Sequence, residues 1–291
     1  MLSMRYLIVS LASVFLALGI GIFIGFMFDG QEIFLNQQET LISELEYKFG
    51  EIREDNEGLL NTIELKNKQI KHYEDFTSSV FPKLIEGKLK DMKVAIIETN
   101  DDYIYNGINS TILKAGGSVS STTYIKKEFL LEEEEKLEEV YNYFINKKQI
   151  VVNKDNFIDF LSEYIIISII ENDIDILQYL REKEMLELKG NYMDNIDCFI
   201  IAGGSAIEEL GEMVEKIDIP IIKTIKQYNI PIVGVEQSNV KYSYIDIYRR
   251  QKISTIDNVE TMMGQYSIIE VLQGNYGNFG VKPSADRLIP Q

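Results

Sequence analysis

Hydrophobic positions are unevenly spread along this chain of 291 residues, and the longest uninterrupted apolar run lies near its start. The stretch SLASVFLALGIGIFIGFMF, residues 10–28, carries no charge, and the apolar run as a whole covers residues 6–28. An α-helix rises about 1.5 Å per residue, so about 20 apolar residues cross a hydrocarbon core of about 30 Å. The pattern therefore predicts a transmembrane helix over residues 6–28.

A cleaved signal peptide and a buried soluble helix are the alternatives to a permanent anchor. The apolar core of a signal peptide usually spans about 7 to 15 residues and follows several cations. Here the run is longer, and Arg5 is the single cation before it. A buried helix is disfavoured because residues 6–28 are apolar on every face and nothing later in the chain could wrap them. The anchor is favoured over both.

The orientation of the span follows from the charges at its two ends. Cationic residues close to a span are retained on the cytoplasmic side. Arg5 precedes the span, whereas the first charges after it are acidic and the first cation is Lys48. We expect residues 1–5 to form a short cytoplasmic tip before the membrane span, with everything from Asp29 onward outside the cytoplasm.

Small residues recur every four positions within the span, at Ser13, Ala17, Gly21 and Gly25. This spacing places them on one helical stripe, where two helix backbones can approach closely. Gly and Ala are also common in membrane helices that do not pair. The regular spacing favours a helix-pairing face.

Residues 29–80 are predicted to form a coiled-coil stalk, because apolar residues recur in heptads. Nine of twelve core positions are apolar or aromatic; one core position holds Leu35, Ile42, Phe49, Asn56, Ile63 and Ile70, and the other holds Gln38, Leu45, Ile52, Leu59, Lys66 and Tyr73.

Asn56 bears on how the stalk pairs. An Asn at this heptad position is tolerated where it meets its own copy across a parallel dimer, and it fixes the register at a cost in stability. The membrane stripe and the stalk both favour a parallel homodimer. The alternative is a single helix that folds back on the globular part of its own chain.

The stalk is expected to end at Phe81-Pro82, because proline disfavours helical geometry in the residue before it. Over residues 90–291, short β-rich runs such as KVAIIET, DCFIIAGG and IPIVGVE alternate with helical stretches. This alternation predicts one extracytoplasmic α/β domain, hereafter the head, with a mostly parallel sheet covered on both faces. The apolar run inside EYIIISII, residues 163–170, is too short to span a membrane and is expected to be the buried side of a helix.

Charge and cysteine content narrow the function classes. All 46 acidic residues and 28 of the 29 cations follow residue 28, which leaves that part with a formal charge of −18. Binding to nucleic acid is therefore disfavoured. Cys198 is the single cysteine and cannot form an internal disulfide; its strand-like apolar context is typical of an inert core residue.

Catalysis is disfavoured by the inventory of reactive side chains. The single histidine, His72, falls in the stalk, so Ser205 in GGSA lacks the usual base and does not form a G-x-S-x-G elbow. We therefore expect a protein that is not an enzyme.

A ligand-binding loop is a further candidate, since open α/β sheets bind ligands at the carboxyl ends of their strands. The candidate residues follow the first and the central strand: Asp101, Asp102, Gly203, Gly204 and Ser205. The favoured alternative is structural, with the aspartates as helix caps and the glycines as a tight turn.

The opening VSLASVFLALGIGIFIG, the coil after it and the ending STIDNVETMMGQYSIIEVLQGNYGNFGVKPSADRLIP resemble one bacterial family. It is the copper transporter family named for mycobacterial copper transport protein B, and the resemblance covers essentially the whole chain. The resemblance implies a single-pass bacterial envelope protein linked to copper homeostasis. It also implies a link to cell division and daughter-cell separation, with which some actinobacterial relatives are associated.

The residues themselves offer little for copper, which is selected by thiolate, thioether and imidazole ligands. The chain has one Cys, one His and nine Met, and Met262-Met263 is its one adjacent Met pair. One membrane helix cannot enclose a polar path by itself. We therefore expect no bound cofactor and favour a dimeric envelope scaffold whose head binds a protein or cell-wall partner. Copper transport or homeostasis is the alternative.

Overall fold

The computed structural model describes residues 4–99, 101–208 and 212–291, with side chains described for all of these except 28–36, 147, 212 and 213. The chain divides into two compact units, Met1–Glu74 and Asp75–Gln291. Each unit is described by itself below.

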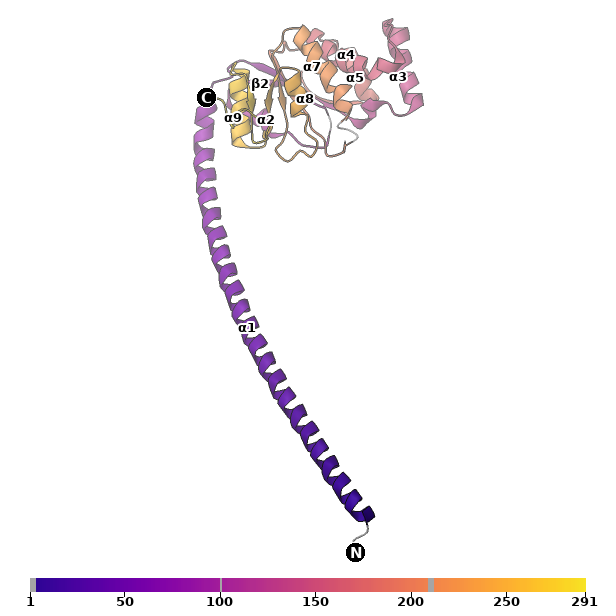
Figure 1. Cartoon of the computed structure of the whole chain (residues 1–291). Coiled ribbons are helices and arrows are strands. Elements are labelled where there is room, and N and C mark those ends of the chain that lie inside the picture. The colour runs from indigo at the N-terminus through magenta and orange to yellow at the C-terminus, as the bar shows by residue number, and fades with distance from the viewer. Residues whose placement is uncertain (1–3, 100, 209–211) are drawn as a thin grey trace. The chain divides into compact units, whose positions relative to one another are not determined.

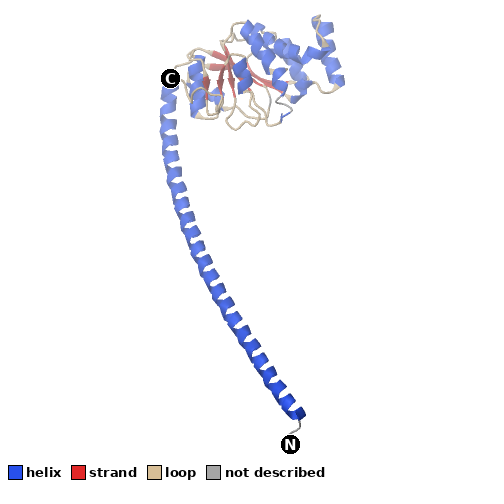
Figure 2. Cartoon of the chain, in the orientation of Figure 1, coloured by secondary structure: helices blue, strands red, loops and turns tan. Residues whose placement is uncertain are grey.

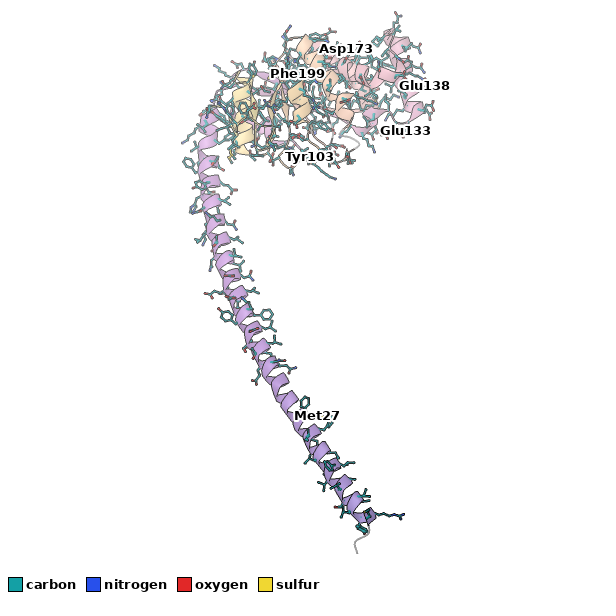
Figure 3. All side chains as sticks on the ribbon, in the orientation of Figure 1. Met27, Tyr103, Glu133, Glu138, Asp173 and Phe199 are labelled. Atoms are coloured by element: carbon teal, nitrogen blue, oxygen red, sulfur yellow. The ribbon has the colours of Figure 1, made fainter. Side chains whose placement is uncertain are left out.

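The first unit consists of the long helix α1, Met4–Ile85, as far as Glu74 (Figure 1). Its segment Met4–Met27 is long and apolar enough to cross a membrane by length and composition, and none of it is buried. The span predicted over residues 6–28 falls on this segment, whose last residue, Met27, is labelled in Figure 3. The N-terminal apolar helix fits a single-pass anchor.

The stripe of small residues in this helix is open. A Cβ added at Gly21 or Gly25 would meet no atom within 4 Å. The Ser13 hydroxyl donates a hydrogen bond to the Ser10 carbonyl oxygen at 2.8 Å, which satisfies this polar group within its own helix. The stripe therefore presents backbone rather than bulky side chains, and its pairing stays a prediction.

Beyond the apolar segment, α1 exposes the predicted heptad residues. Asn56 is exposed, and the side chain of Leu35 lies outside the described residues. Ion pairs such as Lys48 with Glu51 (2.6 Å) and Lys68 with Glu64 (2.7 Å) lie on the helix flanks. More than half of the surface of each described apolar core residue is exposed: Ile42, Leu45, Phe49, Ile52, Leu59, Ile63 and Ile70. An apolar stripe of this length lacks a covering element within its own unit, and the coiled coil stays a prediction.

The head folds as alternating strands and helices. Its first half contains β1 (Lys93–Glu98), α2 (Gly107–Lys114), β2 (Ser118–Ile125), η1 (Lys127–Leu130), α3 (Glu134–Lys148), η2 (Lys154–Asn156), α4 (Phe157–Glu171) and α5 (Ile174–Glu182). Its second half contains β3 (Leu186–Gly190), β4 (Cys198–Ala202), η3 (Glu212–Glu215), α7 (Asp218–Gln227), β5 (Ile232–Val235), α8 (Ile245–Arg250), β6 (Ser254–Ile256), α9 (Met262–Leu272) and β7 (Asn278–Phe279).

One seven-stranded sheet runs through the head in the order β3-β2-β1-β4-β5-β6-β7 (Figure 2). Neighbouring strands are parallel except for β2 and β3, which pair antiparallel at one edge. The prediction of an α/β fold with a mostly parallel sheet is confirmed.

The period-two alternation of the strands builds two cores, one on each face of the sheet. In β1, Ala95 and Ile97 face a cluster completed by α3, α4, α5, α7 and α8, which also contains Phe199, labelled in Figure 3. Val94 and Ile96 face the opposite cluster, with α2, α9 and the end of α1. Helices on both faces bury all of β4 and all of β1 except Lys93.

Helix α1 ends at Ile85, beyond the end predicted at Phe81-Pro82. Proline lacks a backbone N–H and costs about 3 kcal/mol in a helix interior. Here Phe81 and Ile85 are buried in the core with α2 and α9, and the carbonyl oxygen of Pro82 accepts the N–H of Glu86 at 3.0 Å. Burial of these two side chains offsets the proline, so the last turns of α1 belong to the head.

Candidate functional site

The carboxyl ends of β1 and β4 meet at the topological switch point of the sheet. Helix α2, which follows β1, packs its Ile108 and Ile112 on one face, while α7, which follows β4, packs Ile221 and Ile225 on the other. Loops leaving neighbouring strands in opposite directions open a crevice at the carboxyl edge, where ligands of open α/β sheets bind.

A cavity of about 370 Å³ lies at this switch point. The loop after β1 contributes Thr99, Asp101 and Asp102; the end of β2 and the segment after it contribute Ile125, Lys126, Lys127, Leu130 and Glu132; the connection from β4 to α7 contributes Ile207, Val214, Ile217 and Asp218; and Tyr244 completes the lining.

Hydrogen bonds join the two predicted ligand loops, which follow β1 and β4. One carboxylate oxygen of Asp102 accepts hydrogen bonds from the Ser205 hydroxyl and from the backbone N–H of Ala206, each at 2.8 Å. Ser205 is fully buried, and its oxygen also accepts the N–H of Ile207 at 3.0 Å. Asp102 thus fixes the spacing of the β1 and β4 loops, and Asp101 is an exposed part of the cavity lining. The expectation that one of these aspartates caps the following helix is wrong, because Asn106 is the N-cap residue of α2 and no side chain caps this helix.

The paired glycines are explained by packing and backbone conformation. A Cβ on Gly203 would lie 2.0 Å from the hydroxyl oxygen of Tyr248, so only glycine leaves room for this buried ring. Gly204 has a φ of +94°, which side-chain-bearing residues rarely adopt. The N–H groups of Gly203 and Ser205 donate to the carbonyl oxygens of Val235 and Tyr242. This loop therefore matches the tight turn that the sequence favoured, with two of its N–H groups paired inside the fold.

Asp218 is a buried carboxyl group in the wall of the cavity that the sequence analysis did not identify. It begins α7, is 1% exposed, and accepts a hydrogen bond from the Tyr248 hydroxyl at 3.2 Å. Burial raises the pKa of Asp218 to about 7, against the lowering effect of hydrogen bonds from Thr99 and Tyr248. The cavity therefore contains an acid that changes charge near neutral pH.

Glu98 is a second buried acid, at the carboxyl end of β1. Burial raises the pKa of Glu98 to about 7, and the charge of Lys189 opposes that shift. Nearby, the Tyr105 hydroxyl donates to the carbonyl oxygen of Gly203 at 2.5 Å. Glu98 ends an apolar run in the sequence and Asp218 lies between isoleucines, but their burial depends on tertiary packing that the local pattern does not show.

The other half of the carboxyl edge is closed by the C-terminal tail. Asp257, directly after β6, accepts hydrogen bonds from the backbone N–H groups of Val281 (2.7 Å) and Lys282 (3.0 Å). The Lys282 ammonium group forms an ion pair with Glu236, which follows β5 and is fully buried. The STID and FGVKPSADRLIP segments thus contact each other and cover the β5–β6 part of this edge.

Cys198 and the Met262-Met263 pair are the residues that the sequence offered for metal binding. Within residues 4–99, 101–208 and 212–291, no group of three or more His, Cys, Asp or Glu side chains could hold a metal ion. Cys198 is buried, and burial raises the pKa of its thiol to about 12. Met262 and Met263 open α9, where the Met262 sulfur accepts a long contact from the Ser78 hydroxyl at 4.0 Å.

Comparison with known proteins adds a family to this geometry. A family model described as "Copper transport outer membrane protein, MctB" matches residues 1–290, essentially the whole chain. Among curated proteins, none matches this chain.

Proposed function

The chain belongs to the MctB family of copper transport outer membrane proteins, and from that premise we propose that it is a membrane-anchored, dimeric envelope scaffold rather than an enzyme. Its head lies outside the cytoplasm and binds a protein or cell-wall partner. The observation that carries the proposal is the joining of a membrane-length apolar helix to an α/β head with an open cavity.

We propose that the N-terminal helix is a single-pass anchor with a defined orientation. Met4–Met27 has the length and composition to cross a membrane, and Arg5 is the cation at its N-terminal end. We place residues 1–5 in the cytoplasm and the head in the envelope space. The family description, which names a membrane protein, agrees with an envelope location.

We propose that α1 pairs with the α1 of a second copy in a parallel dimer. The stripe of Ser13, Ala17, Gly21 and Gly25 is open, and the apolar heptad residues of α1 are exposed within their own unit. Apolar surface left in water along a helix favours association by about 25 cal/mol per Å² that a partner covers. A second α1 in parallel register covers the stripe and pairs Asn56 with its copy.

Partner binding by the head is the third part, and the cavity between β1 and β4 is its proposed place. Asp102 holds the two loops at a fixed spacing, so the cavity is formed before a partner arrives. Preformed sites avoid the entropic cost of ordering loops on binding. We place this activity in cell division or separation, the role that the family resemblance suggests.

Copper handling is the alternative that the family description names. We propose that the chain has no resident copper, because the sequence has one Cys, one His and a single adjacent Met pair, and the described residues hold no metal-binding group of three or more His, Cys, Asp or Glu. The full chain in detergent is expected to bind Cu(I) no more tightly than a generic acidic protein of equal charge. Stoichiometric binding that survives a competing chelator, and that is lost in Met262→Leu/Met263→Leu, would contradict this.

A deletion strain separates the two functions in the cell. The scaffold proposal predicts a cell-separation defect under the microscope, with growth unchanged across a range of copper concentrations. The full chain is expected to restore separation, and Val214→Trp, which fills the cavity, is expected to restore it poorly. Copper-sensitive growth with normal separation would reject the scaffold in favour of copper homeostasis.

A further inference from the structure

The last turns of α1 and the first turns of α9 form an apolar groove on the head, with a volume of about 290 Å³. No charged side chain lines it. Its walls are Phe76, Val80 and Leu84 of α1, Met263 and Tyr266 of α9, and Ile289 of the tail. Phe76 is 67% exposed, Leu84 52% and Met263 43%, so this groove leaves large apolar side chains in contact with water.

The two walls are fixed relative to each other inside the head. Phe81 and Ile85 point from the same turns of α1 into the core that α9 completes. The Lys88 ammonium group, just after α1, forms an ion pair with Glu270 of α9, and the Gln273 side chain donates to the Lys88 carbonyl oxygen at 2.9 Å. The groove is therefore part of the folded head.

The heptad register of the stalk continues into this groove. Counting on from Ile70 and Tyr73, the next core positions are Thr77, Val80 and Leu84. All three line the groove, and α1 is one helix through this region, to Ile85. The side of α1 that the heptads assign to a partner helix is thus the side that the head leaves uncovered.

We propose that the groove binds the α1 helix of a second copy of this chain, so that the dimer seam extends from the stalk onto the head. This inference rests on the parallel dimer proposed above. In a two-fold dimer each copy places its Val80 and Leu84 against the other's groove, and α9 adds a wall that a simple coiled coil lacks. Met263, with its flexible thioether chain, adapts to the approaching helix.

Disulfide trapping in membranes tests the inference with the full chain. Cys198→Ser provides the background, and single cysteines replace Leu84, Asn56 or Ser79. Core positions of a parallel pair bring equivalent Cα atoms within disulfide range, whereas exposed Ser79 faces away from the seam. Leu84→Cys is expected to give at least about threefold more cross-linked dimer than Ser79→Cys, comparable to Asn56→Cys.

A charge placed in the groove provides a second readout. Met263→Glu puts a carboxylate where the partner helix would bury it, and unpaired buried charge is costly. The variant is expected to lower cross-linking at Leu84→Cys by about threefold and to leave Asn56→Cys unchanged. The matched control is Met193→Glu, which carries the same substitution at an exposed methionine outside the groove.

The outcomes separate the groove from the dimer. If Asn56→Cys cross-links but Leu84→Cys gives no more dimer than Ser79→Cys, the groove inference is wrong and the dimer stands. The groove would then bind something other than a second α1. Control levels at both positions overturn the dimer and the inference with it. The groove inference is also wrong if Met193→Glu lowers the cross-linking of Leu84→Cys as much as Met263→Glu does. The loss would then come from the added charge itself and not from its place in the groove.

Discussion

Lys282→Met is expected to destabilise the head by about 3–5 kcal/mol, because it leaves the fully buried carboxylate of Glu236 without its ion-pair partner. The Ser243 hydroxyl and the Tyr244 N–H still donate to this carboxylate, but neither supplies a positive charge. Chemical unfolding of the full chain in detergent, followed by tyrosine fluorescence, measures the loss; most of the 17 tyrosines lie in the head and there is no tryptophan.

The pH dependence of this variant has a definite sign. Burial raises the pKa of Glu236, and the ion pair with Lys282 opposes that shift. Without Lys282 the pKa of Glu236 rises further. At low pH Glu236 is protonated and its burial costs little, and stability is lost as the pH rises through the pKa of Glu236 in the folded state. The deficit of Lys282→Met is therefore expected to grow from acidic to neutral pH.

Two further variants control this experiment. The double variant Glu236→Gln/Lys282→Met removes the unpaired charge and is expected to recover much of the loss. Lys223→Met, at an exposed position of α7, is expected to change stability by less than about 0.5 kcal/mol. A double variant as unstable as Lys282→Met would show that the tail, and not the charge, accounts for the effect.

Asp218→Asn is expected to remove much of the loss of stability that the head suffers between acidic and neutral pH. Burial raises the pKa of Asp218 from 3.8 to about 7. A carboxyl group whose pKa is raised by folding contributes fully below its unfolded pKa, and that contribution is lost as the pH rises through the folded pKa. The amide keeps an acceptor for the Tyr248 hydroxyl and carries no charge.

The size of the effect follows from the shift, at about 1.4 kcal/mol for each pKa unit. Between about pH 5 and about pH 8, wild-type stability is expected to fall by about 2–3 kcal/mol more than that of Asp218→Asn. Unfolding curves at the two pH values measure this, with exposed Asp246→Asn of α8 as the control. Parallel pH profiles for the wild type and Asp218→Asn would mean that Asp218 titrates as an ordinary exposed aspartate.

The parts of the fold that depend on local pattern were predictable. The N-terminal apolar helix and the mostly parallel sheet are read from apolar runs, and the structure has both; the membrane crossing of Met4–Met27 stays a prediction. The helix end at Phe81-Pro82 was misplaced because the penalty of proline is local, whereas the burial of Phe81 and Ile85 depends on α2 and α9, which lie far along the sequence.

The candidate site was predictable only in part, for the same reason. The rule that strand ends meet at one edge brought together Asp102 and Ser205, which are 103 residues apart and form a hydrogen bond. The ion pair of Glu236 with Lys282 could not be foreseen, because it depends on the path of the tail across the sheet edge. The raised pKa of Asp218 could not be predicted either, because the burial of Asp218 depends on packing around α7 and not on its neighbours in the sequence.

Protease digestion of intact protoplasts tests most directly the claim that this chain is an anchored protein with an external head. With a tag at each end, the account predicts that added protease removes the C-terminal tag and the head, while the N-terminal tag stays in the membrane on a short fragment. Lysed protoplasts give the fully digested control. A head that is protected until lysis would reverse the orientation, and a mature N-terminus near Asp29 would replace the anchor with a cleaved signal peptide.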